Sequence, residues 1–217
     1  MRVRPRSIGL LVGIAAVSAC SRGQTLIDGF GSAAQRLRVV NTTAIKLEDR
    51  NGVRLSPAAG SAVAWVEGSD FQSGTIEVDV RGREWMSQKF VGVAFHRKDD
   101  NTYEAVYVRP FNFRTSDRTR RQHAVQYITL PDFDYDRLRR DFPEEFENPV
   151  DASIEPTDWI KLRVVVRGTR VQIYVGAVNE PALEVPKLGL LYGGQVGLWV
   201  GNDSGGDFAN LVITPTK

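Results

Sequence analysis

FQSGTIEVDVRGREWMSQKFVGVAFHRKDDNTYEAVYVRPFNFR, residues Phe71 to Arg114, contains three β-strand patterns in a row. Apolar and polar residues alternate over 75–80, more loosely over 90–97, and again over 102–109. Gly82 and the polar run 98–101 separate the three segments. Alternation with a period of two, with turn residues between the segments, predicts antiparallel β-sheet.

The rest of the chain continues the β pattern. Its clearest hairpin joins WIKLRVVVR (159–167) to RVQIYV (170–175) through Gly168-Thr169. Many short strands at this spacing are typical of a sandwich or a barrel. The segment 131–150 departs from the pattern because it is charged and aromatic and holds three prolines. We expect it to be an insertion between strands, with a short helix from Asp134 to Asp141.

The N-terminus has the parts of a secretory signal. Three arginines within the first six residues precede an apolar run over 8–17, and small residues lead to Cys20. The run is shorter than the roughly 20 apolar residues that a membrane-spanning helix needs. Val17-Ser18-Ala19-Cys20 resembles a bacterial lipobox, in which the cysteine becomes the acylated first residue, although Val replaces the more usual Leu.

These features predict a lipoprotein signal peptide over 1–19, a tether over 20–35 and one domain over 36–217. We expect the protein to be secreted across the inner membrane and lipid-anchored through Cys20 to the cell envelope, in the outer membrane by analogy with enteric signals. The alternative is an ordinary cleaved signal in which the cysteine is incidental.

The charge balance changes when the leader is removed. The whole chain has 28 basic and 26 acidic residues, and the leader contributes three arginines and no acid. The mature chain therefore has a formal net charge of −1, so no general attraction to nucleic acid is expected.

The C-terminal half resembles a known superfamily. A strand ending in GQVGLW (194–199) is followed by a loop and a closing strand, DFANLVI (207–213). Together with the hairpin and with FQSGTIEVDV (71–80), this pattern is similar to concanavalin A-like lectins and glucanases. It is more narrowly similar to the laminin-G-like and 3-keto-disaccharide-hydrolase-type jelly rolls of bacteria, over residues 60–214.

The resemblance implies an all-β jelly-roll sandwich of two antiparallel sheets with one short helical insertion. It specifies fold more than activity, because this fold carries both lectins and hydrolases. A closing strand buries large aromatic residues on its inward face, so we expect Trp159, Trp199 and Phe208 to lie in the core.

Laminarinase-type members of the superfamily carry three acids on one strand. Glu77 and Asp79 match the first two, but Gly82 stands where the third acid is expected, so the triad is incomplete. Ile76, Val78 and Val80 form an apolar face, and the favoured interpretation of the two acids is a solvated opposite face.

Polar and aromatic side chains gather on 96–127. If Val106 and Val108 face the core, Tyr107 and Arg109 lie on the outer face, where the resemblance implies ligand binding. Aromatic rings stack on sugars, and planar polar groups bind pairs of hydroxyls. The expected ligand-binding residues are His96, Tyr107, Arg109, Asn112, Arg114, His123, Gln126 and Tyr127. The alternative is a solvated sheet face with cross-strand ion pairs.

Two further segments carry weaker expectations. The turn 202–207 holds Asp203 and Asp207, and laminin-G relatives often bind calcium in such loops, but a plain glycine-rich turn is favoured. The run 118–121 is expected to be a solvated basic loop, in which replacement of Arg120 does little.

Three functions remain open from the sequence. The first is a surface-anchored carbohydrate-binding protein, accessory to glycan breakdown, with a glycan or sugar as its partner. The second is a glycoside hydrolase of the 3-keto-disaccharide type, with Glu104 or His123 as acid/base. The third is a structural or protein-interaction module of the cell envelope.

Overall fold

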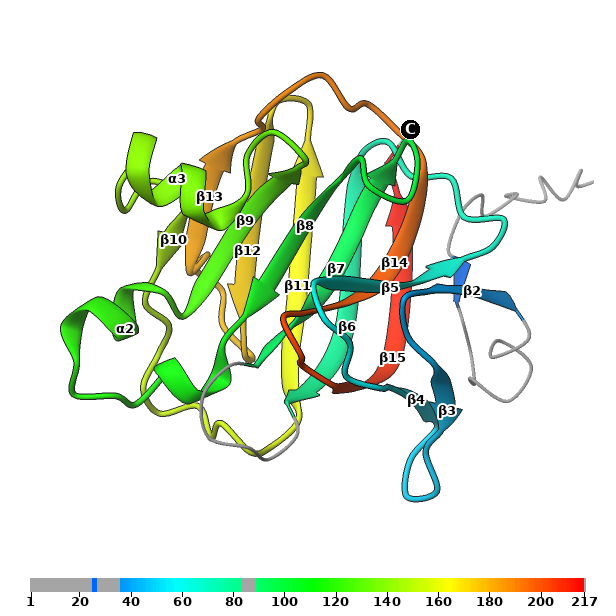
Figure 1. Ribbon diagram of the computed structural model, residues 1–217, viewed down its shortest axis with the longest axis horizontal. Coiled ribbons are helices and arrows are strands. Elements are labelled where there is room, and N and C mark those ends of the chain that lie inside the picture. The colour runs from blue at the N-terminus through cyan, green and yellow to red at the C-terminus, as the bar shows by residue number, and fades with distance from the viewer. Residues whose placement is uncertain (1–24, 27–35, 83–88, 217) are drawn as a thin grey trace, which may run out of the picture.

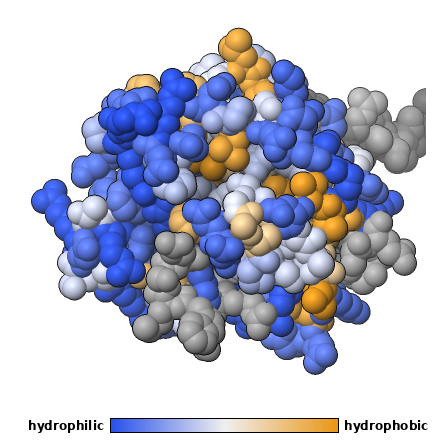
Figure 2. Space-filling view, in the orientation of Figure 1, coloured by the Kyte–Doolittle hydropathy of each residue, from blue (hydrophilic) through white to orange (hydrophobic). Residues whose placement is uncertain are grey.

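Two antiparallel β-sheets lie face to face in this computed structural model, which describes residues 25–26, 36–82 and 89–216 (Figure 1). The predicted signal peptide, Cys20 and most of the tether lie outside the described residues. No helix in the described residues is long and apolar enough to cross a membrane. In the same orientation, Figure 2 shows a largely hydrophilic surface with small hydrophobic patches near its middle, at its upper edge and toward its right side.

In the described part of the chain, the first sheet has eight strands in the order β13-β12-β11-β6-β15-β4-β3, and β1 pairs with β15. Their bounds are β1 Thr25–Leu26, β3 Ala44–Lys46, β4 Gly52–Leu55, β6 Gly74–Gly82, β11 Ile160–Arg167, β12 Arg170–Val175, β13 Leu183–Pro186 and β15 Gly206–Pro215.

The second sheet of this part has seven strands in the order β10-β9-β8-β7-β14-β5-β2. Their bounds are β2 Leu37–Val40, β5 Ser61–Val66, β7 Phe90–Arg97, β8 Tyr103–Val108, β9 Val125–Leu130, β10 Glu147–Asn148 and β14 Gln195–Gly201. The helices are the 3-10 turn η2 (Pro110–Asn112), α2 (Arg118–Gln122) and α3 (Tyr135–Asp141).

This architecture confirms the predicted all-β sandwich. The three strands of 71–114 are β6, β7 and β8, and the hairpin of 159–175 is β11 with β12. Helix α3 confirms the helical insertion, and the Asp134 side chain caps it by accepting a hydrogen bond of 2.8 Å from the Arg137 amide.

The core lies between the two sheets. On β6, Ile76, Val78 and Val80 are at most 1% exposed, whereas Glu77 and Asp79 point to the outer face as predicted. Phe208 on β15 is fully buried, as expected. Each such apolar side chain contributes roughly 1.5–3 kcal/mol by leaving water.

The other two expected core tryptophans are placed differently. Trp159 is partly exposed, and the guanidiniums of Arg50 and Arg81 lie 4.6 and 4.5 Å from the centre of its ring. Trp199 is buried, but it lies on the outer face of the seven-stranded sheet and not between the sheets. Its role is therefore tied to the pocket on that face.

Candidate functional site

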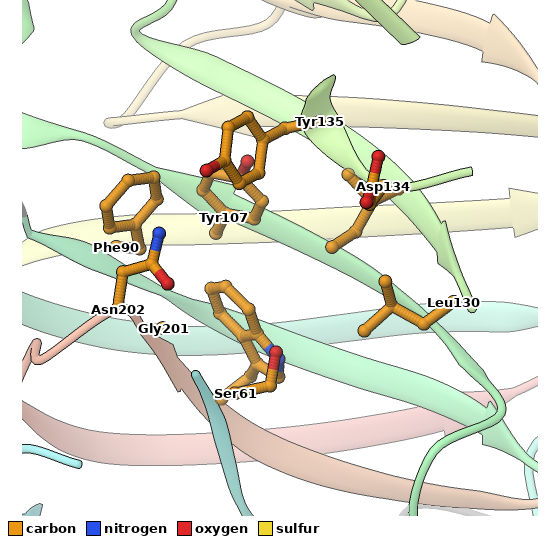
Figure 3. Close-up of a pocket in the computed structure, with 10 residues that line it drawn as sticks. Ser61, Phe90, Tyr107, Leu130, Asp134, Tyr135, Gly201 and Asn202 are labelled. Atoms are coloured by element: carbon orange, nitrogen blue, oxygen red, sulfur yellow. The ribbon is translucent and has the colours of Figure 1, made fainter. Parts of the chain in front are cut away.

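The outer face of the seven-stranded sheet holds a pocket of about 210 Å³ with an aromatic lining. It is lined by Ser61, Phe90, Tyr107, Ile128, Leu130, Asp134, Tyr135, Trp199, Gly201 and Asn202. Figure 3 shows Phe90, Tyr107 and Tyr135 grouped at one end of this space and Leu130 at the other. We call this space the aromatic half of the site.

Two glycines make room for the rings. Tyr107 and Trp199 both pair with Gly92, which lies between them on β7. A Cβ on Gly92 would lie 2.8 Å from that of Tyr107, and one on Gly201 would lie 2.4 Å from the Trp199 indole. Because both positions lack side chains, Tyr107 and Trp199 stack across β7 with their ring centres 4.9 Å apart.

A second pocket of about 240 Å³ adjoins the first and is cationic. It is lined by Lys89, Phe90, Arg109, Phe111, Asn112, Arg120, His123, Tyr135, Arg139 and Asn202. Phe90, Tyr135 and Asn202 line both spaces, so the two form one site with a shared wall. Among the described residues that line this cationic half, none is a carboxylate.

Arg109 leaves the end of β8 and lies at the centre of the cationic half. Its guanidinium donates to the Tyr107 hydroxyl at 3.3 Å and to the Gln126 carbonyl at 3.1 Å. It also lies 4.5 Å above the Phe90 ring. Burial lowers the pKa of Arg109 below its usual value. The contacts that hold the Arg109 guanidinium in place thus come from aromatic rings and uncharged oxygen atoms.

Glu147 is a buried carboxylate behind the cationic half, and its charge is already paired. Arg139 lies 3.1 Å from its Oε2, and His123 Nδ1 lies 2.7 Å from the same atom. Despite this neighbour, burial lowers the pKa of His123, and the guanidiniums of Arg139 and Arg109 add to that effect. The direction of this shift favours the neutral imidazole.

Two short helices position the remaining side chains. Tyr135 and Arg139 are four residues apart on α3 and thus share a face, with the guanidinium 5.2 Å above the ring. On α2, Asp117 caps the helix by accepting hydrogen bonds from the amides of Thr119 and Arg120. Arg120 in turn lines the cationic half.

Comparison with known proteins places the fold. No family model and no curated protein matches the chain. Among solved structures it is similar to the carbohydrate binding module CBM66 from Bacillus subtilis, at 16% identity and a TM-score of 0.60 over 81% of this chain and 93% of that one.

Two other structures are similar over most of their length. The exoplasmic/lumenal domain of VIP36, in a Ca²⁺/Man3GlcNAc-bound form, has 12% identity and a TM-score of 0.59 over 85% of this chain and 87% of that one. A Bacillus licheniformis β-glucanase has 10% identity and a TM-score of 0.51 over 91% and 94%. The chain has the concanavalin A-like jelly-roll fold.

The jelly roll brings together four of the predicted binding residues. Tyr107 lines the aromatic half, and Arg109, Asn112 and His123 line the cationic half. Gln126 lies beneath them, where its side-chain oxygen accepts from Tyr107 at 2.8 Å. The predicted strand phase, with Val106 inward and Tyr107 outward, accounts for this grouping.

The structure corrects the predicted roles of three residues. His96 and Tyr127, expected as ligand-binding residues, and Glu104, expected as an acid/base, lie inside the sandwich and not on its outer face. All three are fully buried. Glu104 accepts from the Tyr127 hydroxyl at 2.7 Å and lies 2.9 Å from His96 Nδ1 and 3.2 Å from the ammonium of Lys187, beyond β13. These contacts join the two sheets, so Glu104 supports the fold and does not face a substrate.

The position of His96 follows from a β-bulge. Phe95 and His96 stand opposite one residue of β14, where the register shifts, and His96 has a φ of 53°. The extra residue turns the imidazole inward, where it stacks on Phe71 with ring centres 5.8 Å apart. Alternation alone therefore gives the wrong face for His96.

Arg114 is also misplaced by the prediction. Its guanidinium is exposed and donates to the carbonyls of Ala152 at 2.8 Å and Ser153 at 2.9 Å, and it pairs with Glu155. Arg114 thus anchors the 150–156 loop and does not line the site. The segment expected to be a basic loop is helix α2. Arg120 lines the cationic half, so the expectation that its replacement does little is wrong.

The predicted calcium ligands do not share a site. Asp203 is exposed, whereas Asp207 is buried and paired with Arg54 at 2.6 Å and Arg81 at 2.8 Å. No group of three or more metal-binding side chains occurs within the part of the chain that the structure describes.

The sequence did not identify Phe90, Tyr135, Trp199 and Arg139 as site residues. Glycine spacing was the available signal, since Gly92 and Gly201 stand beside aromatic positions on their strands. Tyr135 and Arg139 were expected on the inserted helix, but nothing in the sequence places that helix over the sheet.

Proposed function

We propose that this protein binds carbohydrate at the two-part site on the outer face of its seven-stranded sheet. The observation that carries the proposal is the shared wall of Phe90, Tyr135 and Asn202, which joins an aromatic space to a polar one. Each half is slightly smaller than the roughly 300–1,000 Å³ of typical small-molecule pockets. A site of this size suits one or two sugar residues.

The chemistry of the lining suits a sugar. Tyr135 is partly exposed and offers its ring to the C–H face of a pyranose, and the buried rings of Tyr107 and Trp199, stacked on each other, form a rigid floor beneath it. Asn112, His123 and Asn202 offer planar or neutral groups for hydroxyls. Preorganised rings reduce the entropy lost on binding.

Binding is favoured over hydrolysis by the distribution of carboxylates. A glycosidase of the common kind needs two carboxyl groups facing one bond. Asp134 is the one carboxylate among the described residues lining the two halves, and its side chain caps α3. Glu104, the acid/base of the 3-keto-disaccharide alternative, is fully buried between the sheets.

The proposal includes a lipid anchor. It is supported by the lipobox-like sequence that ends in Cys20, and it puts the domain on the cell envelope, in the outer membrane by analogy with enteric signals. Cys20→Ser should move the protein from the membrane fraction to the soluble fraction and remove the lipid mass. Retention of the variant in membranes would contradict the anchor.

The test of sugar binding starts from a glycan array and continues with calorimetric titration of the hits. Tyr135→Ala should weaken binding about tenfold, or 1.4 kcal/mol, because Tyr135 lines both halves and is only partly buried. The matched control is Tyr174→Ala, which removes a ring under Arg163 on the outer face of the other sheet.

Tyr174→Ala should leave the affinity unchanged. If the two variants lose affinity equally, the site lies elsewhere. If no glycan binds at all, the envelope-scaffold function replaces the proposal.

A further inference from the structure

We infer that the sugar recognised at this site is acidic, with its anionic group, a carboxylate or a sulfate, held in the cationic half. This inference rests on the proposed carbohydrate function and narrows the class of ligand. Three observations support it: the positive charge of the residues that line the cationic half, the burial of Arg109 without a carboxylate partner among the described residues, and the position of the cationic half beside the aromatic one.

The charge of the lining is one-sided. Lys89, Arg109, Arg120 and Arg139 line the cationic half, and no described lining residue carries a negative charge. The buried carboxylate behind them, Glu147, is engaged by Arg139 and lies against His123. Glu147 thus stands against the three guanidiniums of Arg109, Arg120 and Arg139, and the site retains positive charge that a neutral sugar would leave unmatched.

Arg109 is the buried cation in greatest need of a counter-charge. The side chain is 9% exposed, and its partners among the described residues are the Tyr107 hydroxyl, the Gln126 carbonyl and the backbone carbonyl of His123. Its Nε has no hydrogen-bond partner in this part of the chain. A desolvated guanidinium without a carboxylate is costly, so an anionic ligand gains more here than at an exposed arginine.

Arg120 contributes a second cation at the rim. It is exposed on α2, and no hydrogen bond or ion pair of its side chain occurs among the described residues. A planar guanidinium binds a carboxylate or sulfate through two parallel hydrogen bonds. Arg109 and Arg120 can therefore act on an anion from the floor and the rim of one space.

The shared wall fixes where the anion sits relative to the sugar ring. Phe90 and Tyr135 border both halves, so a pyranose against the aromatic half points one edge into the cationic half. An acidic group on that edge, such as the C6 carboxylate of a uronic acid or a sulfate ester, meets the arginines. A neutral hydroxyl on that edge would leave the charge of Arg109 without a counter-charge.

The test uses matched glycans that differ only in charge. Oligogalacturonate, oligoglucuronate and oligomannuronate are each titrated beside their methyl esters, and sulfated chondroitin is titrated beside unsulfated chondroitin. We expect at least one acidic member to bind about tenfold or more tightly than its neutral or less charged partner. Its affinity should also fall as salt rises, because ions screen the attraction. The pair that shows the difference distinguishes carboxylate from sulfate.

The variant Arg120→Ala tests the contribution of the protein's cations to binding. Arg120 is exposed, so we expect its replacement to leave the domain folded. We expect it to weaken the acidic ligand at least fivefold and its ester by less than twofold. The matched control is Arg118→Ala, an exposed arginine of the same helix that does not line the site, and it should change neither affinity.

Two outcomes separate this inference from the proposed function. If glycans bind in a Tyr135-dependent way but acid and ester bind equally, or Arg120→Ala has no effect, the acidic-sugar inference is wrong and sugar binding stands. If no glycan binds, charged or neutral, the proposed function fails and the inference fails with it.

Discussion

At position 104 a carboxylate lies between two sheets, where an unpaired charge would be costly. Glu104 is matched there by the Lys187 ammonium at 3.2 Å and by the Tyr127 hydroxyl at 2.7 Å. Glu104→Gln leaves the buried ammonium without its counter-charge and should lower the free energy of unfolding by about 3–5 kcal/mol. In a sample that remains folded, sugar affinity should change less than twofold.

Urea unfolding and calorimetric titration measure the two effects. The double variant Glu104→Gln/Lys187→Met should lose less than the sum of the single variants, since it removes both buried charges together. A Glu104→Gln variant with native stability and lost binding or turnover would restore the catalytic interpretation.

Single residues differ in how well the sequence predicts them. Tyr107 and Arg109 were placed on the correct face because β8 alternates regularly. His96 was not, because a bulge is set by the register of β14, which lies about a hundred residues away in sequence. Tyr127 was assigned to the wrong face because strand β9 begins at Val125 and His123 belongs to the end of α2.

At the scale of elements, Asp207 ties three strands of the eight-stranded sheet together. It lies on β15 between its cross-strand partners Arg54 on β4 and Arg81 on β6. Burial alone would raise the pKa of Asp207, but the hydrogen bonds from the two arginines outweigh it and hold the pKa below its usual value.

This shift predicts how stability depends on pH. In the unfolded chain an aspartate titrates at about pH 3.9. The stability that Asp207 contributes is therefore complete above that pH and is lost as the pH falls toward the lower pKa of the folded protein. Asp207→Asn should therefore lower stability at pH 7 by about 1–3 kcal/mol and flatten its decline below about pH 4. Urea titrations across this range measure both quantities.

The matched control is Asp203→Asn, in the exposed turn that precedes β15. It should follow the wild-type pH curve closely. Equal slopes for wild type and Asp207→Asn would contradict the role of the ion pairs.

Elements with a strong apolar pattern were predicted well. Strands β6, β11 and β12 alternate or run apolar over six or more residues, and the sequence located each within about two residues. Helix α2 was missed because it is a single short turn of polar residues, none of which is buried. Its one signal was the capping residue Asp117, which the arginine run obscured.

At the scale of the whole molecule, the site depends on the layering of the jelly roll. One face of the seven-stranded sheet packs on the other sheet (Figure 1). Helix α3 brings Tyr135 to the opposite face, where the ring centres of Tyr135 and Phe90 are 6.4 Å apart. Alternation predicted the two-sheet core. It did not predict that the outer face would be enclosed, because that depends on where a polar insertion folds back.

The most direct test of the site is a crystal structure of the protein with the tightest-binding glycan from the array. We expect a sugar ring against Tyr135, above the floor that Tyr107 and Trp199 form, with an acidic substituent within hydrogen-bond distance of Arg109 or Arg120. A sugar bound on the outer face of the eight-stranded sheet, or anywhere away from the two-part site, would contradict it.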